Sequence, residues 1–356
     1  MTFYEFFAGG GMARLGIGPA WRCLFANEWS EKKAAAYRAR FGGEELRVCD
    51  VATLKAAELP GRTNLAWASF PCQDLSLAGN GAGLAGARSG TFRPFWRLIE
   101  ELAREGRPPR TVVLENVVGA ITSHGGRDFA EILGCMAGAG YSYGPLVLDA
   151  ADFVPQSRPR LFVVATFGEG GPRGEGPAYG HSRPLVDAYD GLTSKLRRRW
   201  IWWALAEPAR PATTLADCID DAGPWNDAAY TARLLSLMSP LNRRKVERAQ
   251  REGGRVVGTV YRRTREGRQR AEVRFDGVAG CLRTPAGGSS RQTVIVVEEK
   301  RVRSRLLSGR EAARLMGVPE DYPIPSSANE AYHLFGDGVA PPVVRYLAEQ
   351  VLERLG

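Results

Sequence analysis

A cysteine directly after an apolar run is the first residue whose type and position suit catalysis. Cys72 stands in the segment Phe-Pro-Cys-Gln at residues 70–73, between a rigid proline and a glycine-rich stretch at 74–90. Glu115 follows the apolar run 111–114 in the same way. A carboxyl group near a thiol can act as a proton donor beside a nucleophile. Taken alone, a cysteine is more often inert core, and a lone acid at a strand end is more often a cap, so the surrounding residues decide.

A glycine turn and two acids indicate a nucleoside site. The turn Phe-Ala-Gly-Gly-Gly at residues 7–11 lacks the third glycine of a dinucleotide fingerprint, because Arg14 stands there. Glu28 lies 19 residues after Gly9, where an acid can accept both ribose hydroxyls. Asp50 could accept from an adenine amino group. Two acids without a clear phosphate cradle suit an adenosine on a neutral or cationic tail, such as S-adenosylmethionine.

The elements that must position these residues alternate between strands and helices. We expect strands at residues 3–7, 23–26, 46–49, 65–70, 111–114 and 160–166, and helices at 12–16 and 31–41. This order predicts a mostly parallel sheet with helices on both faces, and such sheets bind ligands outside the carboxyl ends of their strands. Glu28, Asp50, Cys72 and Glu115 all fall at such ends. Ser308 and Glu311 predict a later helix start, and a final helix at 342–355 should pack on the first domain.

The basic charge is concentrated in one part of the chain. Of the 356 residues, those at 195–310 include 25 Lys and Arg against 12 Asp and Glu, whereas the remainder has 23 against 27. Arginine matches phosphate oxygens and guanine edges. A solvated face or an arginine-rich composition explains any single run, but a whole segment of opposite sign favours nucleic acid.

Other classes of site find little support in the composition. Six cysteines without a Cys-x-x-Cys pair, and three histidines, argue against a zinc site. The sequence has no run of 18 apolar residues and its start lacks the features of a signal peptide. We therefore expect a cytoplasmic protein with reduced thiols.

The chain resembles the DNA (cytosine-5)-methyltransferase family in eight segments that occur in the family's order. These are Phe-Ala-Gly-Gly-Gly at 7–11, Asn-Glu-Trp at 27–29, Asp-Val at 50–51, Phe-Pro-Cys-Gln at 70–73, Glu-Asn-Val at 115–117, Gln-Ser-Arg-Pro-Arg at 156–160, and residues 305–317 and 332–343. The resemblance implies an α/β fold: a Rossmann-like S-adenosylmethionine-dependent methyltransferase domain at 1–168 and 306–356, with a mostly parallel sheet. A smaller, irregular DNA target-recognition domain would occupy 169–305.

The resemblance also implies a mechanism. Cys72 would attack C6 of a cytosine while Glu115 hydrogen-bonds N3 and supplies a proton, so that C5 can take the methyl group. Arg160 would hold the cytosine O2, and Arg158 would bring further positive charge. The base must leave the double helix to reach the thiol, and residues 74–90 would close over it as a lid.

The implied binding residues form two sets. The cofactor set comprises Phe7, Ala8, Gly9, Gly11, Glu28, Trp29, Asp50, Val51, Pro71, Asp337, Gly338 and Val339. The DNA set comprises Gln73, Arg88, Ser89, Arg283, Thr284, Gly287, Gly288, Arg291 and Gln292, in part because residues 280–292 resemble the family's recognition loop.

Two positions depart from the family's pattern. Glu5 replaces its usual Asp, and Gly-Asp-Gly-Val at 336–339 replaces Gly-Asn-Ser-Val. An acid at 337 remains compatible with the cationic sulfonium of S-adenosylmethionine.

The expected partners are double-stranded DNA and a cognate restriction endonuclease acting on the same site, with the chain a monomer, no metal, and a cytoplasmic, nucleoid-associated location. A tRNA cytosine-5 methyltransferase is one alternative, although it would not need the long basic insert. A catalytically inactive DNA-binding homologue is another, although it should have lost Cys72, Glu115 or Arg160.

Overall fold

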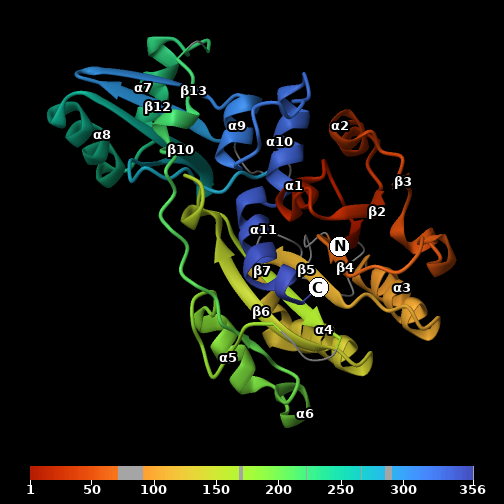
Figure 1. Cartoon of the computed structure of the whole chain (residues 1–356). Coiled ribbons are helices and arrows are strands. Elements are labelled where there is room, and N and C mark those ends of the chain that lie inside the picture. Colours follow the sequence, from red (N-terminus) through yellow and green to blue (C-terminus); the bar gives the residue numbers. More distant parts are fainter. Residues whose placement is uncertain (71–90, 168–170, 222, 266, 285–290, 356) are drawn as a thin grey trace. The chain divides into compact units, whose positions relative to one another are not determined.

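The computed structural model describes residues 1–70, 91–167, 171–221, 223–265, 267–284 and 291–355 (Figure 1). The chain divides into two compact units. Unit 1 comprises Met1–Asp149, Pro159–Pro208 and Val343–Gly356, and unit 2 comprises Ala150–Arg158 and Ala209–Pro342. Among the described residues, no helix is both long and apolar enough to cross a membrane.

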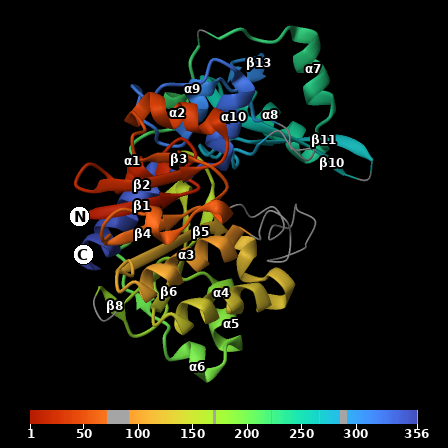
Figure 2. The ribbon, with the colours of Figure 1, turned by 90° about the vertical axis from the view of Figure 1, so that its right-hand side faces the viewer.

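Unit 1 contains a seven-stranded sheet in the order β3-β2-β1-β4-β5-β7-β6. Strands β1 to β5 run parallel, whereas β7 is antiparallel to both of its neighbours. Figure 2 shows β3, β2, β1, β4 and β5 in this spatial order. The strands are β1 Thr2–Phe6, β2 Arg22–Glu28, β3 Leu46–Val48, β4 Leu65–Ala68, β5 Thr111–Val117, β6 Ser142–Asp149 and β7 Pro159–Thr166. The mostly parallel sheet is confirmed, and β6 is an additional strand that the sequence analysis did not predict.

Helices of unit 1 cover this sheet with apolar residues. Helix α3 buries Phe95, Trp96 and Leu98 in the same core as Phe6 of β1. The helices are α1 Met12–Ile17, α2 Glu31–Phe41, α3 Phe92–Arg104, α4 Arg127–Gly138, and α11 Pro341–Leu347, which continues through a π-helical turn at Ala348–Leu352 into α12 Glu353–Leu355. Short 3-10 turns lie at Val51–Thr53, Ala56–Glu58, Val118–Ile121 and Ser123–Gly126.

The last helix returns to unit 1. Arg345 of α11 donates a hydrogen bond from Nη1 to the carbonyl oxygen of Ile17, at the end of α1, over 2.6 Å. The sequence predicted this return, and the structure confirms it.

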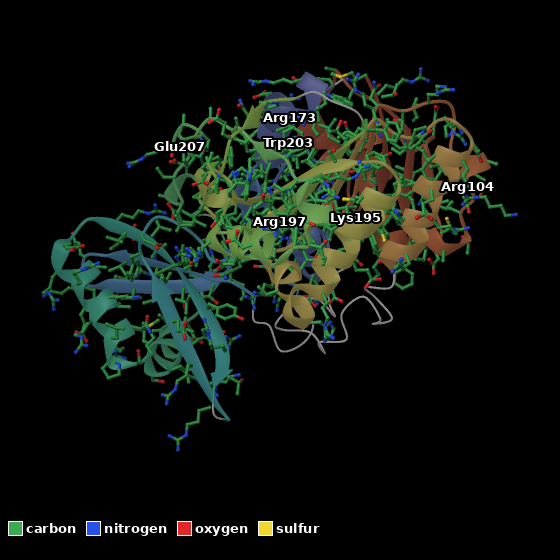
Figure 3. All side chains as sticks on the ribbon, turned by 90° about the horizontal axis from the view of Figure 1, so that it is seen from below. Arg104, Arg173, Lys195, Arg197, Trp203 and Glu207 are labelled. Atoms are coloured by element: carbon green, nitrogen blue, oxygen red, sulfur yellow. The ribbon has the colours of Figure 1, made fainter. Side chains whose placement is uncertain are left out.

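The segment after β7 also belongs to unit 1, although the sequence analysis assigned it to the DNA domain. It contains β8 Arg173–Gly174, α5 Arg183–Gly191, α6 Ser194–Arg197 and β9 Trp202–Trp203. Arg173 pairs with Trp203, and the two lie close together in Figure 3. The indole Nε1 of Trp203 donates to the carbonyl oxygen of Gly144 in β6 over 2.9 Å. Because the segment completes this edge of the sheet, the basic stretch that begins at 195 starts on unit 1.

Unit 2 is more regular than the sequence analysis predicted. Its four-stranded antiparallel sheet has the order β11-β10-β12-β13. The elements are α7 Ala228–Ser236, α8 Pro240–Glu252, β10 Arg255–Arg265, β11 Arg268–Arg274, β12 Thr293–Glu298, β13 Arg301–Leu306, α9 Gly309–Leu315 and α10 Ala328–Asp337, with 3-10 turns at Ala150–Asp152 and Ala216–Cys218. Val246 of α8, Val260, Val273 and Ile295 share one buried core.

Helices α9 and α10 lie in unit 2. The sequence instead predicted that the catalytic domain resumes at residue 306. A buried ion pair explains the difference. Arg305 Nη1 donates to Glu311 Oε2 over 2.7 Å, and Glu311 Oε1 accepts from the backbone N–H of Asp220 over 2.8 Å. These bonds tie the start of α9 to β13 and to the 219–221 segment, so only the residues from Val343 onward belong to unit 1.

Candidate active site

The glycine turn after β1 leaves open space where a ligand could approach the backbone. Gly9 and Gly11 have φ values of +58° and +78°, in the left-handed region that favours glycine. A Cβ on Gly9 would meet no atom within 4 Å, whereas one on Gly11 would collide with the ring of Phe41. Gly11 is therefore required by packing within unit 1, and Gly9 by the backbone conformation beside an open space. Phe7 also has a positive φ, of 58°, a strained conformation of the kind found at functional sites.

Glu28, at the end of β2, is fixed by the backbone of the turn. Its Oε2 accepts from the N–H of Gly9 over 2.8 Å, and its Oε1 accepts from the N–H groups of Trp29 and Ser30 over 3.0 and 2.8 Å. The carboxylate is 5% exposed. A carboxylate has about four lone-pair sites, and three are used here, so about one remains to accept from a ribose hydroxyl.

The neighbouring residues suit an adenine ring. Trp29 is 77% exposed, unusual for so large an apolar side chain, and an exposed indole face can stack on a base. Asp50 accepts from Ala52 N–H through Oδ1 over 2.9 Å, and no described residue donates a hydrogen bond to its Oδ2. Val51 and Ala8 are buried. The open turn, the fixed carboxylate and the exposed indole fit an adenosine carried by S-adenosylmethionine.

Strand register places the predicted catalytic acid at the same edge of the sheet. Asn27, Phe6, Ala68 and Leu114 form one row across β2, β1, β4 and β5. Glu28, Phe7, Ser69 and Glu115 each follow this row by one residue. With strands about 4.8 Å apart, the backbones of Glu28 and Glu115 are about 14 Å apart.

Glu115 and Arg160 form a buried pair at this edge. Arg160 Nε lies 3.3 Å from Glu115 Oε1, and their side chains are 15% and 7% exposed. They are diagonal neighbours on β5 and β7, where Val117 pairs with Arg160 and Glu115 with Phe162. Two of the three predicted catalytic residues in the described part of the chain are therefore in contact. The pair offers a carboxyl group and a guanidinium, the groups needed to hold N3 and O2 of a cytosine.

The predicted nucleophile lies outside the described residues, as do Pro71, Gln73, Arg88, Ser89, Gly287, Gly288 and the predicted lid at 74–90. Phe70, the last described residue before this gap, contacts the residue next to Glu115: its carbonyl oxygen accepts a hydrogen bond from Asn116 Nδ2 over 3.4 Å. Cys72 follows Phe70 by two residues.

Three of the described cysteines are poor candidates for the nucleophile. Burial raises the pKa of Cys23 to about 12 and that of Cys218 to about 11. Burial also raises the pKa of Cys135. A raised pKa keeps a cysteine as the neutral thiol, which is a much weaker nucleophile than the thiolate.

Arg158 is bound by backbone carbonyl groups of unit 2. It is 1% exposed and lies in unit 2, where Nη1 donates to Leu282 O over 2.8 Å and Nη2 donates to Gly336 O and Gly338 O over 2.7 and 2.6 Å. Nη1 also lies 3.3 Å from Cys281 Sγ. These contacts make Arg158 a link between two segments of unit 2, and its role beside a thiolate stays a prediction.

Arg158 thus connects the segment 336–339, predicted to bind the methionine end of the cofactor, with the start of the predicted recognition loop. A Cβ on Gly336 would lie 2.8 Å from Thr284 N, so only glycine permits this close approach. Asp337 is exposed, Gly338 is half-buried and Val339 is buried.

The described DNA-set residues fall into two groups. Arg283 is exposed and Thr284 half-buried, as base or phosphate contacts require. Arg291 Nη1 donates to Asn329 Oδ1 over 3.3 Å. Gln292 is only 3% exposed and packs against Gly280, so this prediction is not supported. The residue directly precedes β12, and its backbone carbonyl accepts from Leu307 N–H, which turns its side chain into the unit.

Tyr261 of β10 was not predicted from the sequence as a residue of the DNA-binding surface. The guanidinium of Arg283 lies 5.8 Å from the centre of its ring, and that of Arg263 lies 5.3 Å away. An aromatic residue alternating with arginines along a strand was the available signal.

Comparison with known proteins identifies the family to which these features belong. The C-5 cytosine-specific DNA methylase family matches residues 1–353. Type II methyltransferase M.NlaX of Neisseria lactamica is 30% identical over 98% of this chain and 95% of its own length. Type II methyltransferase M1.ScrFI of Lactococcus lactis subsp. cremoris is 28% identical over 99% of this chain and 78% of its own length.

Solved structures support the fold. The methyltransferase EhMeth of Entamoeba histolytica superimposes with a TM-score of 0.66 at 15% identity, covering 100% of this chain and 99% of its own. The family model matches nearly the whole sequence. Membership of this family explains both the Glu28 carboxylate beside the glycine turn and the Glu115–Arg160 pair at the same edge of the sheet. The chain belongs to the C-5 cytosine-specific DNA methylases, enzymes that transfer a methyl group from S-adenosylmethionine to C5 of cytosine in DNA.

Proposed function

We propose that this chain methylates cytosine in double-stranded DNA through a transient covalent bond between Cys72 and C6 of a base rotated out of the helix. The observation that carries this proposal is the buried Glu115–Arg160 pair, whose strand end is in register with the glycine turn. Cys72 follows β4, the strand between that turn and Glu115. A base inside the duplex cannot reach a side chain at this edge, so extrusion is required.

Glu115 and Arg160 prepare the ring for attack. Glu115 hydrogen-bonds N3 and gives it a proton as the Cys72 thiolate bonds to C6, which moves electron density to C5. Arg160 holds O2 and stabilises the negative charge that develops there. After C5 has taken the methyl group, a solvent water molecule takes the C5 proton, the electrons of that C–H bond form the C5–C6 double bond, the C6–S bond breaks and N3 returns its proton to Glu115. The ring regains its aromatic character, and the thiolate is restored.

S-adenosylmethionine supplies an electrophilic methyl group on a sulfonium centre. We assign its adenosine to the open turn of unit 1: Glu28 accepts from a ribose hydroxyl, Trp29 stacks on the adenine and Asp50 accepts from its amino group. Phe7, Ala8, Gly9, Gly11, Val51 and Pro71 complete this set. Asp337, Gly338 and Val339 of unit 2 remain candidates for the methionine end.

Arg158 serves this function as a positioning residue. Its three carbonyl contacts hold Leu282 and the 336–338 segment together, so it supports both the recognition loop and the predicted cofactor tail segment. Arg283, Thr284 and Arg291 are the described candidates for DNA contact. Gln73, Arg88, Ser89, Gly287 and Gly288 complete the proposed DNA set.

The biological setting follows from the relatives, which are named Type II methyltransferases. We propose that a cognate restriction endonuclease acts on the same DNA site, that the chain works as a monomer, and that it acts in the cytoplasm on the nucleoid.

Trapping of the covalent intermediate tests the function. Bisulfite sequencing of plasmid DNA from an expressing host first identifies the target site. A duplex with 5-fluorocytosine at that site should then form a denaturant-resistant adduct with the wild-type protein, because fluorine replaces the proton that must leave C5. Cys72→Ser should give no adduct while retaining S-adenosylmethionine binding by calorimetry. Normal turnover by Cys72→Ser would overturn the mechanism, and methylation of a tRNA transcript but no DNA would overturn the substrate.

A further inference from the structure

The β10–β11 hairpin of unit 2 has two chemically different faces. Residues opposite one another in an antiparallel pair share a face, and the face changes at each step along a strand. Val260 pairs with Val273 and Arg262 with Ala271 on one face, whose apolar members are buried in the unit 2 core. Helix α8 covers that face, since its Val246 and Ala249 join the same core and Lys245 Nζ donates to Val273 O over 3.1 Å. Figure 2 shows β10 and β11 side by side.

The opposite face carries arginines that stand directly opposite one another. Arg263 pairs with Arg270 on this face, and Arg268 precedes Arg270 by two residues and so lies on the same face. Like charges at opposed positions destabilise a sheet. Glu272 offsets one of them, because its Oε2 lies 2.8 Å from Arg263 Nη2. Arg268 and Arg270 are exposed, and neither forms an ion pair with any residue in the described part of the chain. This arrangement costs stability unless a negative ligand lies on it.

Tyr261 connects this face to the start of the recognition loop. Its ring lies on the same face, two residues before Arg263, with the Arg263 and Arg283 guanidinium groups 5.3 and 5.8 Å from its centre. Because Arg283 is exposed, the four arginines at 263, 268, 270 and 283 form one positive surface, which we call the hairpin face.

We propose that the hairpin face binds backbone phosphates of the DNA that flanks the target base. This inference rests on the proposed function and adds a binding site to it. Arginine forks match phosphate geometry, and DNA supplies negative charge in a continuous row that opposed arginines could follow. The contacts add affinity and set the orientation of the duplex, and they carry no sequence information. Recognition of the bases is then the role of the loop that begins at Arg283.

The opposite side of unit 2 provides a matched control. Arg244 and Arg251 of α8 are exposed and form no ion pair with any described residue. They lie on the helix that covers the other face of the sheet. If arginine content alone determined DNA binding, Arg244 and Arg251 would contribute as much as Arg268 and Arg270. Our proposal predicts that only Arg268 and Arg270 contribute.

The experiment compares two double variants of the full chain, Arg268→Gln with Arg270→Gln, and Arg244→Gln with Arg251→Gln. Fluorescence anisotropy would measure Kd for a short labelled duplex containing the target site, between about 50 and 200 mM salt. Each lost phosphate contact lowers the slope of log K against log salt by about 0.9. The hairpin variant should therefore lose about 1.8 from the slope and bind at least about tenfold more weakly at moderate salt. The α8 variant should match the wild type.

Methyl transfer and melting temperature separate binding from other effects. The hairpin variant should have an increased KM for DNA with an unchanged kcat, and should melt at or above the wild-type temperature, because it removes opposed like charges. An unchanged salt slope, or an equal loss in the α8 variant, would overturn the hairpin face while leaving the proposed function intact. If the wild type itself neither methylates DNA nor binds it more tightly at low salt, the proposed function fails instead.

Discussion

Charged groups follow different rules at the catalytic edge of unit 1 and on the hairpin face of unit 2. At the catalytic edge, Glu28 and Glu115 are buried and held by specific partners. On the hairpin face, Arg268 and Arg270 are exposed beside other arginines. Chemistry at one carbon atom requires groups fixed in place, whereas attraction to a polyanion requires only charge on the correct face. The first requirement restricts residue type and position, and the second leaves both freer to vary.

The largest effect should come from the fixed edge. Glu115→Gln keeps the size and hydrogen-bonding capacity of the side chain but cannot donate the proton, so kcat should fall by about 10²–10⁴-fold. Single-turnover methylation of the identified DNA site would measure this loss. Arg268→Gln also removes one charge, but it should change KM for DNA and leave kcat intact. A similar kcat for Glu115→Gln and the wild type would contradict the distinction between the two regions.

The second test compares a buried arginine–glutamate ion pair with an exposed one, both in unit 2. The Arg305–Glu311 side chains are 5% and 0% exposed, and those of Arg248–Glu252 are 66% and 62% exposed. Glu311→Gln leaves a buried guanidinium without its counter-charge, which should cost about 3–5 kcal/mol of unfolding free energy. Glu252→Gln makes the same change in water and should cost less than about 1 kcal/mol. Urea unfolding measures both, and equal losses would show that burial does not set the cost.

This contrast explains which parts of the molecule could be predicted from the sequence. Helix α2 was predicted at its observed bounds, 31–41, and the strands of unit 1 within about three residues, because short apolar runs alternate with helical patterns there. Strand β6 was missed because Gly144 and Pro145 interrupt its apolar pattern. Strands β10 and β11 were missed because arginines occupy both faces, so the alternation that marks a strand is weak.

Individual site residues show the same limit. Glu115 and Arg160, which two separate motifs assigned to one site, lie in contact, whereas Arg158 lies in unit 2, although it is only two residues from Arg160. Its partners Leu282, Gly336 and Gly338 lie more than a hundred residues further along the chain. No local pattern specifies such a contact. The burial of Gln292 likewise depends on Gly280 and on the pairing of β12 with β13.

The third test concerns a buried acid beneath the catalytic edge. Burial raises the pKa of Glu5 to about 8, against an ordinary value of 4.5. Arg14 N–H donates to its Oε1 over 3.2 Å, and its Oε2 is buried without a partner among the described residues. The folded state therefore binds this proton more tightly than the unfolded chain does. The resulting stability is complete below about pH 4.5 and is lost as the pH rises through about 8.

Glu5→Gln should remove this dependence, because the amide stays neutral at every pH. The variant should nearly match the wild type near pH 5 and exceed it near pH 8, by about 4 kcal/mol, since each of the three intervening pH units corresponds to about 1.4 kcal/mol. Urea unfolding across this pH range provides the measurement. A variant that is less stable than the wild type at pH 8 would contradict a raised pKa of Glu5 in the folded protein.

The smallest effect should distinguish two glycines of one turn. Both have positive φ, so alanine at either position costs about 1–2 kcal/mol of conformational strain. A Cβ at position 11 also collides with Phe41, whereas one at position 9 enters open space. Gly11→Ala should therefore destabilise unit 1 more than Gly9→Ala does. Gly9→Ala should instead weaken S-adenosylmethionine binding, since its methyl group occupies the space that we assign to the nucleoside. Calorimetric titration and thermal melting of both variants separate these outcomes. If Gly9→Ala binds the cofactor normally while Gly11→Ala is the less stable variant, the turn has only a structural role and the nucleoside must lie elsewhere along the edge.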